Sequence, residues 1–221
     1  MDLDEWGEGL IEAVYEKWKS KYSFWKPGFK VFYSPVRKHP RVMIISRNPG
    51  GNEESFRRED LGRFERGDFS VPKVHEYVER KYRIAKKMRK LFEGQERMLD
   101  NSIAFTVLFF RSKDMRLWRK KIDRQTRKEM ENFCYEKVRE IMEKIRPKIL
   151  LVIGVETYRK LKEHVLGKVD NEKSINGKNG RRISITARWN DIPVFCVPHM
   201  TGARITNSDF DKNRKIFFSI V

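Results

Sequence analysis

The stretch Arg41-Val42-Met43-Ile44-Ile45-Ser46-Arg47-Asn48-Pro49-Gly50-Gly51 decides the fold expected of this chain. Its short apolar run, rich in β-branched residues, is typical of a buried strand, and Asn-Pro-Gly-Gly ends that strand abruptly. Proline fixes φ and lacks a backbone donor, whereas the paired glycines allow positive φ. The sequence therefore predicts a tight loop at the carboxyl end of a strand, where open α/β sheets bind their ligands.

A second stretch of the same kind lies far along the chain, at Val194-Phe195-Cys196-Val197-Pro198-His199-Met200-Thr201-Gly202. It reads as another apolar strand that ends in a loop, with one histidine at the start of that loop. Two such loops favour a functional site over an ordinary strand-to-loop turn.

The other apolar segments predict a single α/β domain over residues 1–221. Further strands are expected at 102–110, 149–153, 182–189 and 193–197, the last two as a hairpin across Asn190-Asp191. Helices are expected at 2–20, 72–93, 126–145, 154–165 and 209–221, with Thr126 and Glu129 as a capping box. This alternation predicts a three-layer helix–sheet–helix sandwich around a mainly parallel sheet of about four strands.

Three segments between these elements are less regular. Residues 22–40 interleave aromatic with basic side chains, which can stack bases and hold phosphates or can pack the segment onto the core. Residues 52–70 form a polar loop or short helix that could cover the site. Residues 168–182, rich in Gly, Asn and Lys, are expected to be a mobile loop.

The charge balance favours a polyanionic partner. The chain has 49 Lys and Arg against 31 Asp and Glu, a formal net charge of +18. Cations that neutralise phosphates release counterions, so such an excess favours nucleic acid. The alternative is the charge-rich surface of a thermophilic protein, which usually balances the two signs. The densest basic patch is the helix face from Arg80 to Lys90, which includes Lys86 and Lys87.

Cysteine usage and hydropathy exclude several other classes. Cys134 and Cys196 lie in apolar patterns and are expected to be buried and inert; two cysteines supply neither a four-thiolate cluster nor a disulfide framework. No signal peptide and no long apolar span is present. We expect a soluble, cytoplasmic monomer without metal or other cofactor.

Three motifs carry a resemblance to a known family. The strand followed by Arg47-Asn48-Pro49-Gly50 resembles the first motif of the uracil-DNA glycosylase superfamily, in its Asn-Pro-Gly form. Val197-Pro198-His199-Met200-Thr201-Gly202 resembles the second motif, a histidine followed by a loop that enters DNA. Lys148–Leu161 is similar to the family's third strand and helix, and the resemblance spans roughly Val42 to Phe217.

The resemblance implies a monofunctional DNA glycosylase of base excision repair, which flips a deaminated or damaged base out of DNA and hydrolyses its N-glycosidic bond. Asn48 would position the attacking water, and His199 would donate to the leaving base. Thr106 stands where the family has the asparagine that reads the uracil edge, which implies a wider choice of base. Asn101 could serve instead in a different register. The implied substrate-binding residues are Arg47, Pro49, Gly50, Gly51, Thr106 and Thr201. The expected nucleic-acid contacts are Arg111, Lys113, Arg204, Ile205, Lys86 and Lys87, with Ile205 as an apolar wedge or a core residue.

Two other functions compete with this one. A non-catalytic nucleic-acid-binding module could keep the fold and the charge without the activity, an interpretation that Thr106 favours. A phosphate-handling enzyme could use the loop 48–52 as a backbone nest, but no Walker-type lysine follows the glycines and no carboxylate cluster for a metal stands out.

Overall fold

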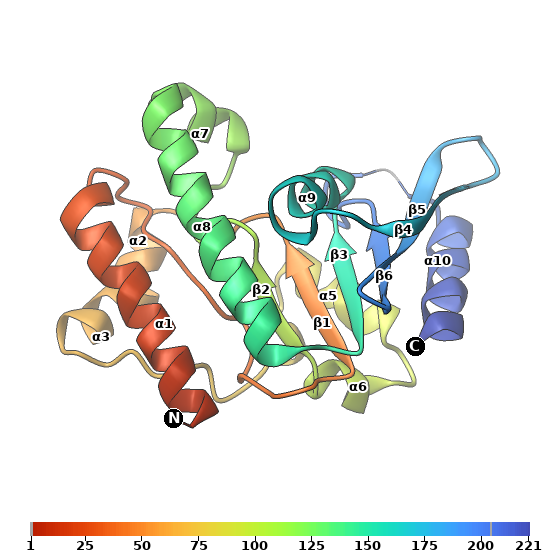
Figure 1. The fold of residues 1–221 in the computed structure, drawn as a ribbon, viewed down its shortest axis with the longest axis horizontal. Helices are drawn as coiled ribbons and strands as arrows, with labels where there is room; N and C mark the ends of the chain where they lie inside the picture. Colours follow the sequence, from red (N-terminus) through yellow and green to blue (C-terminus); the bar gives the residue numbers. More distant parts are fainter. Residues whose placement is uncertain (1, 204) are drawn as a thin grey trace.

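The computed structural model describes residues 2–203 and 205–221, and these form an α/β fold around one six-stranded sheet (Figure 1). The strands are β1 (Val42–Ser46), β2 (Ile103–Thr106), β3 (Ile149–Ile153), β4 (Asp170–Asn176), β5 (Arg182–Trp189) and β6 (Ile192–Val197). Their order is β2-β1-β3-β6-β5-β4. The first four of these neighbours pair in parallel, whereas β5 pairs antiparallel with β6 and with β4.

The parallel strands are buried on both faces, which explains their continuous apolar runs. Side chains of a strand point alternately to its two faces. Met43 and Ile45 of β1 therefore belong to one core cluster, and Val42 and Ile44 to the other.

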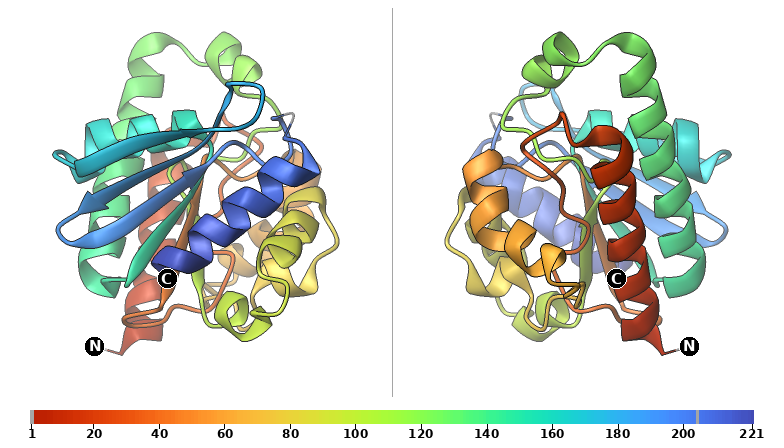
Figure 2. Two further views of the ribbon diagram at one scale, coloured as in Figure 1. Left: turned by 90° about the vertical axis from the view of Figure 1, so that its right-hand side faces the viewer. Right: turned by 90° about the vertical axis from the view of Figure 1, so that its left-hand side faces the viewer.

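Helices cover both faces, so the three-layer arrangement is confirmed at this level. The first cluster packs against α1 (Leu3–Lys17), α8 (Arg124–Ile145) and α9 (Val155–Leu161), and the second against α5 (Arg83–Leu91) and α10 (Asn207–Ile220). Figure 2 shows these two groups of helices on opposite sides of the sheet.

Shorter helical pieces complete the chain. They are α2 (Glu53–Phe56), α3 (Gly62–Glu65), α4 (Glu76–Glu79), α6 (Glu96–Asp100) and α7 (Met115–Lys121), with π-helical turns at Trp18–Tyr22, Arg57–Leu61 and Lys162–Leu166. The polar stretch 52–70 is thus mostly helical. Asn52 caps it, because its side chain accepts from the Ser55 N–H at 3.1 Å.

The sheet has six strands rather than about four. The five segments expected to be strands all contribute one, and the sixth strand, β4, lies in the segment expected to be a mobile loop. Nearly all residues of β4 are exposed, so it has no alternating apolar pattern that marks a strand. Its order comes from backbone pairing with β5, for example between Ser174 and Ile185. The β5–β6 hairpin is confirmed, and Asn190 and Asp191 both have positive φ, as its tight turn requires.

The helix predicted over 72–93 is two helices. The Arg89 guanidinium donates to the carbonyls of Tyr77, Val78 and Arg80 at 2.8, 3.1 and 2.8 Å. These carbonyls therefore have partners outside a helical ladder, and the chain breaks between α4 and α5. Similarly, the expected strand 102–110 leaves the sheet after Thr106.

The expected capping box at Thr126 is also wrong in detail. Asp123 is the cap of α8, because its carboxylate accepts from the Thr126 N–H at 2.9 Å. The long helix itself, its end before Pro147 and the terminal helix are confirmed.

The strand order creates a switch point at the carboxyl end of β1. The chain passes from β1 to β2 on one side, and β3 lies on the other side. Crossovers diverge there and leave a crevice at the strand ends, where doubly wound sheets bind their ligands.

Candidate active site

A cavity of about 590 Å³ lies beside the carboxyl end of β1. Such a volume is in the range of ligand pockets, roughly 300–1,000 Å³. Its walls come from the loop after β1, the loop after β6, the start of the segment that leads into α7, and the residues around α4. We call it the central cavity. The residues used below that line it are Lys30, Tyr33, Asn48, Gly50, Gly51, Glu59, Glu76, Tyr77, Tyr82, Arg111, Ser112, Lys113, His199 and Thr201.

The loop after β1 is tied to the segment after β2. Val107 N–H donates to the Ser46 carbonyl at 2.8 Å, and Leu108 N–H to the Arg47 carbonyl at 2.9 Å. Ser112 N–H donates to the Pro49 carbonyl at 2.8 Å. These bonds continue the β1–β2 alignment past the strand ends and fix the loop that carries Asn48.

The orientation of the Asn48 amide follows from its neighbours. Its Nδ2 donates to the carbonyls of Pro49 and Ser112, each at 2.9 Å. Carbonyl oxygens only accept, so the nitrogen must face them. The amide oxygen remains as the acceptor that can hold a hydrogen of a water or of a ligand.

His199 has a defined tautomer. Its Nδ1 lies 3.4 Å from the Thr201 backbone nitrogen and 3.1 Å from the Thr201 hydroxyl. Since the backbone N–H can only donate, Nδ1 accepts and Nε2 carries the proton. His199 is exposed at the cavity, but desolvation of its ring by nearby protein atoms and the positive charge of Arg47 still lower the pKa of His199 below its usual value. The side chain is therefore a neutral imidazole with an Nε2–H donor near neutral pH.

Two glycines allow the close approaches around these loops. Gly154, at the end of β3, has φ +108° and donates its N–H to the Val197 carbonyl at 2.7 Å, beside the start of the His199 loop. Gly51 has φ +109°, and a Cβ there would lie 2.6 Å from Ser55 Oγ and 2.9 Å from Arg111 Nη1. L-residues rarely adopt either conformation.

Three tyrosines form one side of the central cavity. Tyr33 and Tyr77 stack with ring centroids 5.7 Å apart, and Tyr82 meets Tyr77 edge to face at 6.3 Å. Burial raises the pKa of Tyr33 well above its usual value and that of Tyr77 to about 12. Desolvation by nearby protein atoms raises the pKa of Tyr82 as well, so all three side chains stay neutral. Tyr82 is exposed, whereas Tyr33 and Tyr77 are buried.

Charges at the central cavity are mostly paired. Lys30 forms an ion pair with Glu76, and both side chains are largely buried. Arg111 binds Glu59 at 3.0 Å and Asp60 at 2.5 Å. Burial opposes ionisation of Glu59, but Arg111 outweighs it and the pKa of Glu59 is lowered. The cavity therefore contains two carboxylates, each held by its own cation.

Half of the residues predicted for the site meet in this cavity. They are Asn48, Gly50, Gly51, Arg111, Lys113, His199 and Thr201. Arg47 and Pro49 lie behind the lining; Arg47 is half-buried and influences His199 through its charge, and Pro49 contributes its carbonyl to Asn48.

The structure argues against the expected role of Thr106 in reading a base. Thr106 is fully buried, and its hydroxyl donates to the Leu108 carbonyl at 2.8 Å. It lies outside the cavity lining. Asn101 does not replace it, because it is exposed at the amino end of β2 and binds the Arg97 carbonyl.

Arg111 is a structural residue although it borders the cavity. Only 3% of its surface is exposed, and its guanidinium also donates to the Phe29 carbonyl at 3.3 Å. Its guanidinium is already paired with Glu59 and Asp60, which argues against the expected nucleic-acid contact.

The remaining expected contacts lie away from the central cavity. Ile205 is partly buried against the second core cluster and lines a separate hollow of about 190 Å³ with Pro198 and Ala203, which favours its core role. Lys86 and Lys87 are exposed on α5, and the Lys87 ammonium lies 5.6 Å from the Phe210 ring centroid. Arg204 falls outside the described residues.

Sequence reasoning missed the tyrosine wall and the two carboxylates. Lys30 and Tyr33 were noted only as part of a mixed aromatic and basic segment. Phe29 and Phe32 of that segment are core residues, as the packing role predicts, whereas Lys30 and Tyr33 line the cavity. Base stacking and phosphate binding by this segment stay a prediction. No local pattern distinguishes Tyr77 or Glu59, which reach the cavity through tertiary packing.

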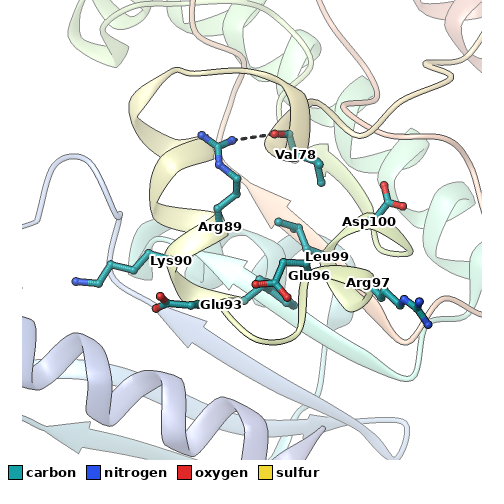
Figure 3. Close-up of a pocket in the computed structure, with 9 residues that line it drawn as sticks. Val78, Arg89, Lys90, Glu93, Glu96, Arg97, Leu99 and Asp100 are labelled. Atoms are coloured by element: carbon teal, nitrogen blue, oxygen red, sulfur yellow. Dashed lines mark hydrogen bonds between the residues drawn. The ribbon is translucent and has the colours of Figure 1, made fainter.

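A second hollow of about 610 Å³ lies between α5 and α6 and shares no lining residue with the central cavity (Figure 3). Figure 3 shows Arg89 directed at the Val78 carbonyl, while Glu93, Lys90 and Arg97 extend outward. It contains no residue of the predicted site, and its charges are of both signs. We regard it as a packing groove.

Comparison with known proteins adds no assignment, because no family of known proteins and no curated protein matches the chain. Within residues 2–203 and 205–221, no three His, Cys, Asp or Glu side chains are arranged to hold a metal ion. No helix in the same part of the chain is long and apolar enough to cross a bilayer.

Proposed function

We propose that the protein is a monofunctional DNA glycosylase that hydrolyses the N-glycosidic bond of a deaminated or damaged base, of the uracil or hypoxanthine type. One observation carries this proposal: Asn48 and His199, which the sequence motifs paired across 150 residues, line the same cavity. The net charge of +18 supports a nucleic-acid substrate.

The chemistry of the two side chains fits this reaction. Cleavage of the C1′–N bond leaves an oxocarbenium-like sugar and places the bonding electrons on the base. The Nε2–H of His199 can donate to the developing oxyanion, while the Asn48 amide oxygen can accept a hydrogen bond from the attacking water. The water delivers hydroxide to C1′, and its proton finally balances the charge of the released base. An amide cannot take up that proton, so positioning contributes most of Asn48's effect.

An aromatic ring at the central cavity supports a flipped base as the group bound. Tyr82 is exposed there and packs on the buried Tyr77, and stacking of a base on an aromatic ring contributes about 1–3 kcal/mol. Thr106 offers no group for reading the base edge, so we expect the enzyme to accept more than one deaminated base. Sites without paired polar contacts discriminate by only about 10–200-fold.

The test is a panel of single- and double-stranded oligonucleotides that each contain one uracil, hypoxanthine or xanthine, scored for abasic sites. The expected result is excision of at least one base, with His199→Ala lowering the rate about 100-fold and more than Asn48→Ala does. His39→Ala and Asn101→Ala are the matched controls, because both residues are exposed outside the cavity, and both should retain the activity.

A non-catalytic nucleic-acid-binding module is the second candidate, which the burial of Thr106 favours. If the folded protein binds oligonucleotides but excises none of the three bases, the glycosylase proposal is wrong and this alternative replaces it.

A further inference from the structure

We propose that the helix α7 and the first turn of α8 hold the phosphate backbone of the nucleic acid that enters the central cavity. We call this the α7 surface; its exposed basic residues are Lys113, Arg116, Arg119, Lys120, Lys121, Arg124 and Lys128. The identity of the bound polymer rests on the proposed function, whereas the surface itself follows from charge, anchoring and position.

The α7 surface carries a larger part of the net charge than its number of residues would predict. Residues 113–128 contain eight Lys and Arg against two Asp, a net charge of +6. Sixteen residues thus account for one third of the total of +18. A solvated surface usually mixes both signs more evenly, whereas here Asp114 and Asp123 are the only acidic residues of the segment.

The cations also lack partners. Within the described residues, Arg119, Lys120, Lys121, Arg124 and Lys128 form no ion pair, and Arg116 pairs only with the neighbouring Asp114. Three of these cations end α7, where the helix dipole favours positive charge. Arg124 begins α8, whose amino end is capped by the Asp123 carboxylate, and Lys128 lies about one turn further along the helix. The cations that form no ion pair remain available to an external anion such as a phosphate.

The α7 surface is fixed rather than loosely attached. Trp118, on the inner side of α7, is almost fully buried and packs on Phe110 and Trp25 with centroid distances of 5.9 and 5.1 Å. Trp25 in turn donates from Nε1 to the Arg111 carbonyl at 2.8 Å. A rigid support lowers the entropy lost when side chains bind a strand.

The position of α7 connects it with the candidate site. Lys113 lines the central cavity, and the neighbouring Ser112 carbonyl accepts from Asn48. Figures 1 and 2 show α7 above the end of the sheet toward which the parallel strands point. The seven residues of α7 extend about 10 Å, which corresponds to about three phosphates of one DNA strand. The surface therefore suits the backbone next to a base that occupies the cavity.

The test is the affinity for an unmodified 20-nucleotide oligonucleotide, single-stranded and duplex, measured by fluorescence anisotropy over a salt series. The variant carries Arg119→Gln, Lys120→Gln and Lys121→Gln. The matched control carries Lys38→Gln, Lys144→Gln and Lys148→Gln, three exposed lysines at the opposite end of the molecule. Along α8, Lys144 lies about 30 Å from Arg124. Both variants have the same net charge.

We expect the α7 variant to bind at least tenfold more weakly near 0.1 M salt, with a salt slope smaller by about two to three, and the control to change less than twofold. Equal losses in the two variants would show that only net charge matters and would overturn the inference, as would no loss in either. If the triple variant has a lowered melting temperature, the three single variants replace it, and each should reduce the slope by about one.

The outcome separates this inference from the proposed function. Binding to an unmodified strand needs no chemistry, so a selective loss in the α7 variant supports the surface even where no base is excised. If bases are excised, the α7 variant should raise KM and leave kcat unchanged. If the α7 variant excises bases with an unchanged KM, the inference is wrong and the glycosylase proposal still stands. Loss of binding to anionic phospholipid vesicles without loss of oligonucleotide binding would also overturn it, in favour of a membrane partner.

Discussion

The Asn48 side chain donates to the Ser112 carbonyl over 2.9 Å, which ties the loop after β1 to the segment that leads into α7. The same amide nitrogen binds the Pro49 carbonyl, so both of its hydrogens are used inside the protein. The candidate water-binding oxygen and the candidate backbone-binding helix are therefore parts of one hydrogen-bonded unit.

This bond makes Asn48→Asp more damaging to the fold than Asn48→Ala. A carboxylate in place of the amide would face two carbonyl oxygens without a hydrogen to donate, at a cost of about 1–3 kcal/mol. Protonation restores one donor, so the folded-state pKa of this Asp should be raised above about 4. An acid whose pKa is higher in the folded than in the unfolded state lowers the free energy of unfolding as it ionises at rising pH. In urea unfolding, Asn48→Asp should be less stable than Asn48→Ala at pH 8, and the gap should narrow at pH 4.5. Equal stabilities at pH 8 would show that the amide does not face the carbonyls.

The two glycines after Pro49 should respond differently to alanine. Gly51 has φ +109° and its Cβ would meet Ser55 and Arg111 at less than 3 Å, whereas a Cβ at Gly50 would meet nothing within 4 Å. We expect Gly51→Ala to lower the free energy of unfolding by about 2 kcal/mol or more, and Gly50→Ala to change it by less than about 1 kcal/mol. Thermal unfolding of both variants measures the difference. Similar losses would contradict the strained conformation at Gly51.

Substitutions at Arg111 and Lys113, two residues apart, should have different effects: the first should lower stability and the second should weaken oligonucleotide binding. Arg111→Met removes the nearer of the two cations that pair with the buried Asp60 carboxylate and leaves only Arg63 at 3.6 Å, which should cost about 3 kcal/mol. Lys113→Met removes an exposed cation at the cavity and should leave the melting temperature unchanged while it weakens oligonucleotide binding. Unfolding curves and anisotropy on both variants test this contrast. If Arg111→Met were as stable as the wild type but bound DNA poorly, Arg111 would be a phosphate contact after all.

The sequence predicts the parallel part of the sheet well because its strands are buried on both faces. A short, continuous apolar run such as Ile149–Ile153 is typical of a parallel strand that is buried on both faces. The same reasoning finds both loops of the candidate site, since each directly follows such a strand. It fails at β4, where the polar side chains face solvent and only the backbone pairing with β5 defines the strand.

The missing parts of the site have physical causes. Nothing in the sequence around Thr106 indicates that its hydroxyl donates to the Leu108 carbonyl. Nothing around Arg111 indicates that Glu59 and Asp60, from the helical segment after Asn52, pair with its guanidinium. The Arg89 guanidinium binds the Tyr77 carbonyl at the break between α4 and α5. Contacts between segments distant in the sequence decide the surroundings of Arg111 and Tyr77, and the departure of the chain from the expected strand decides that of Thr106. Local patterns report neither.

His75 gives the fold a sensitivity to acid. It is buried and caps α4, because Nδ1 accepts from the Tyr77 N–H at 3.2 Å. Its Nε2 lies 3.0 Å from the Ser102 hydroxyl, which donates its own hydrogen to the Leu99 carbonyl. Nε2–H therefore donates to Ser102, and the neutral ring satisfies both of its nitrogens. A proton on Nδ1 would remove the cap.

Burial lowers the pKa of His75 to about 4; the Asp100 charge opposes this shift and the Arg37 charge adds to it. The unfolded chain takes up the proton near pH 6.5, whereas the folded protein takes it up near pH 4. Between these values the unfolded state binds more protons, so the free energy of unfolding should fall as pH is lowered from about 6.5 to 4, by about 3 kcal/mol in total. His75→Asn keeps a capping oxygen but does not titrate, and its urea-unfolding midpoint should change much less across this window. His39→Asn, at an exposed histidine with positive φ, is the control and should keep the wild-type slope. Parallel curves for His75→Asn and wild type would assign the acid sensitivity to other groups.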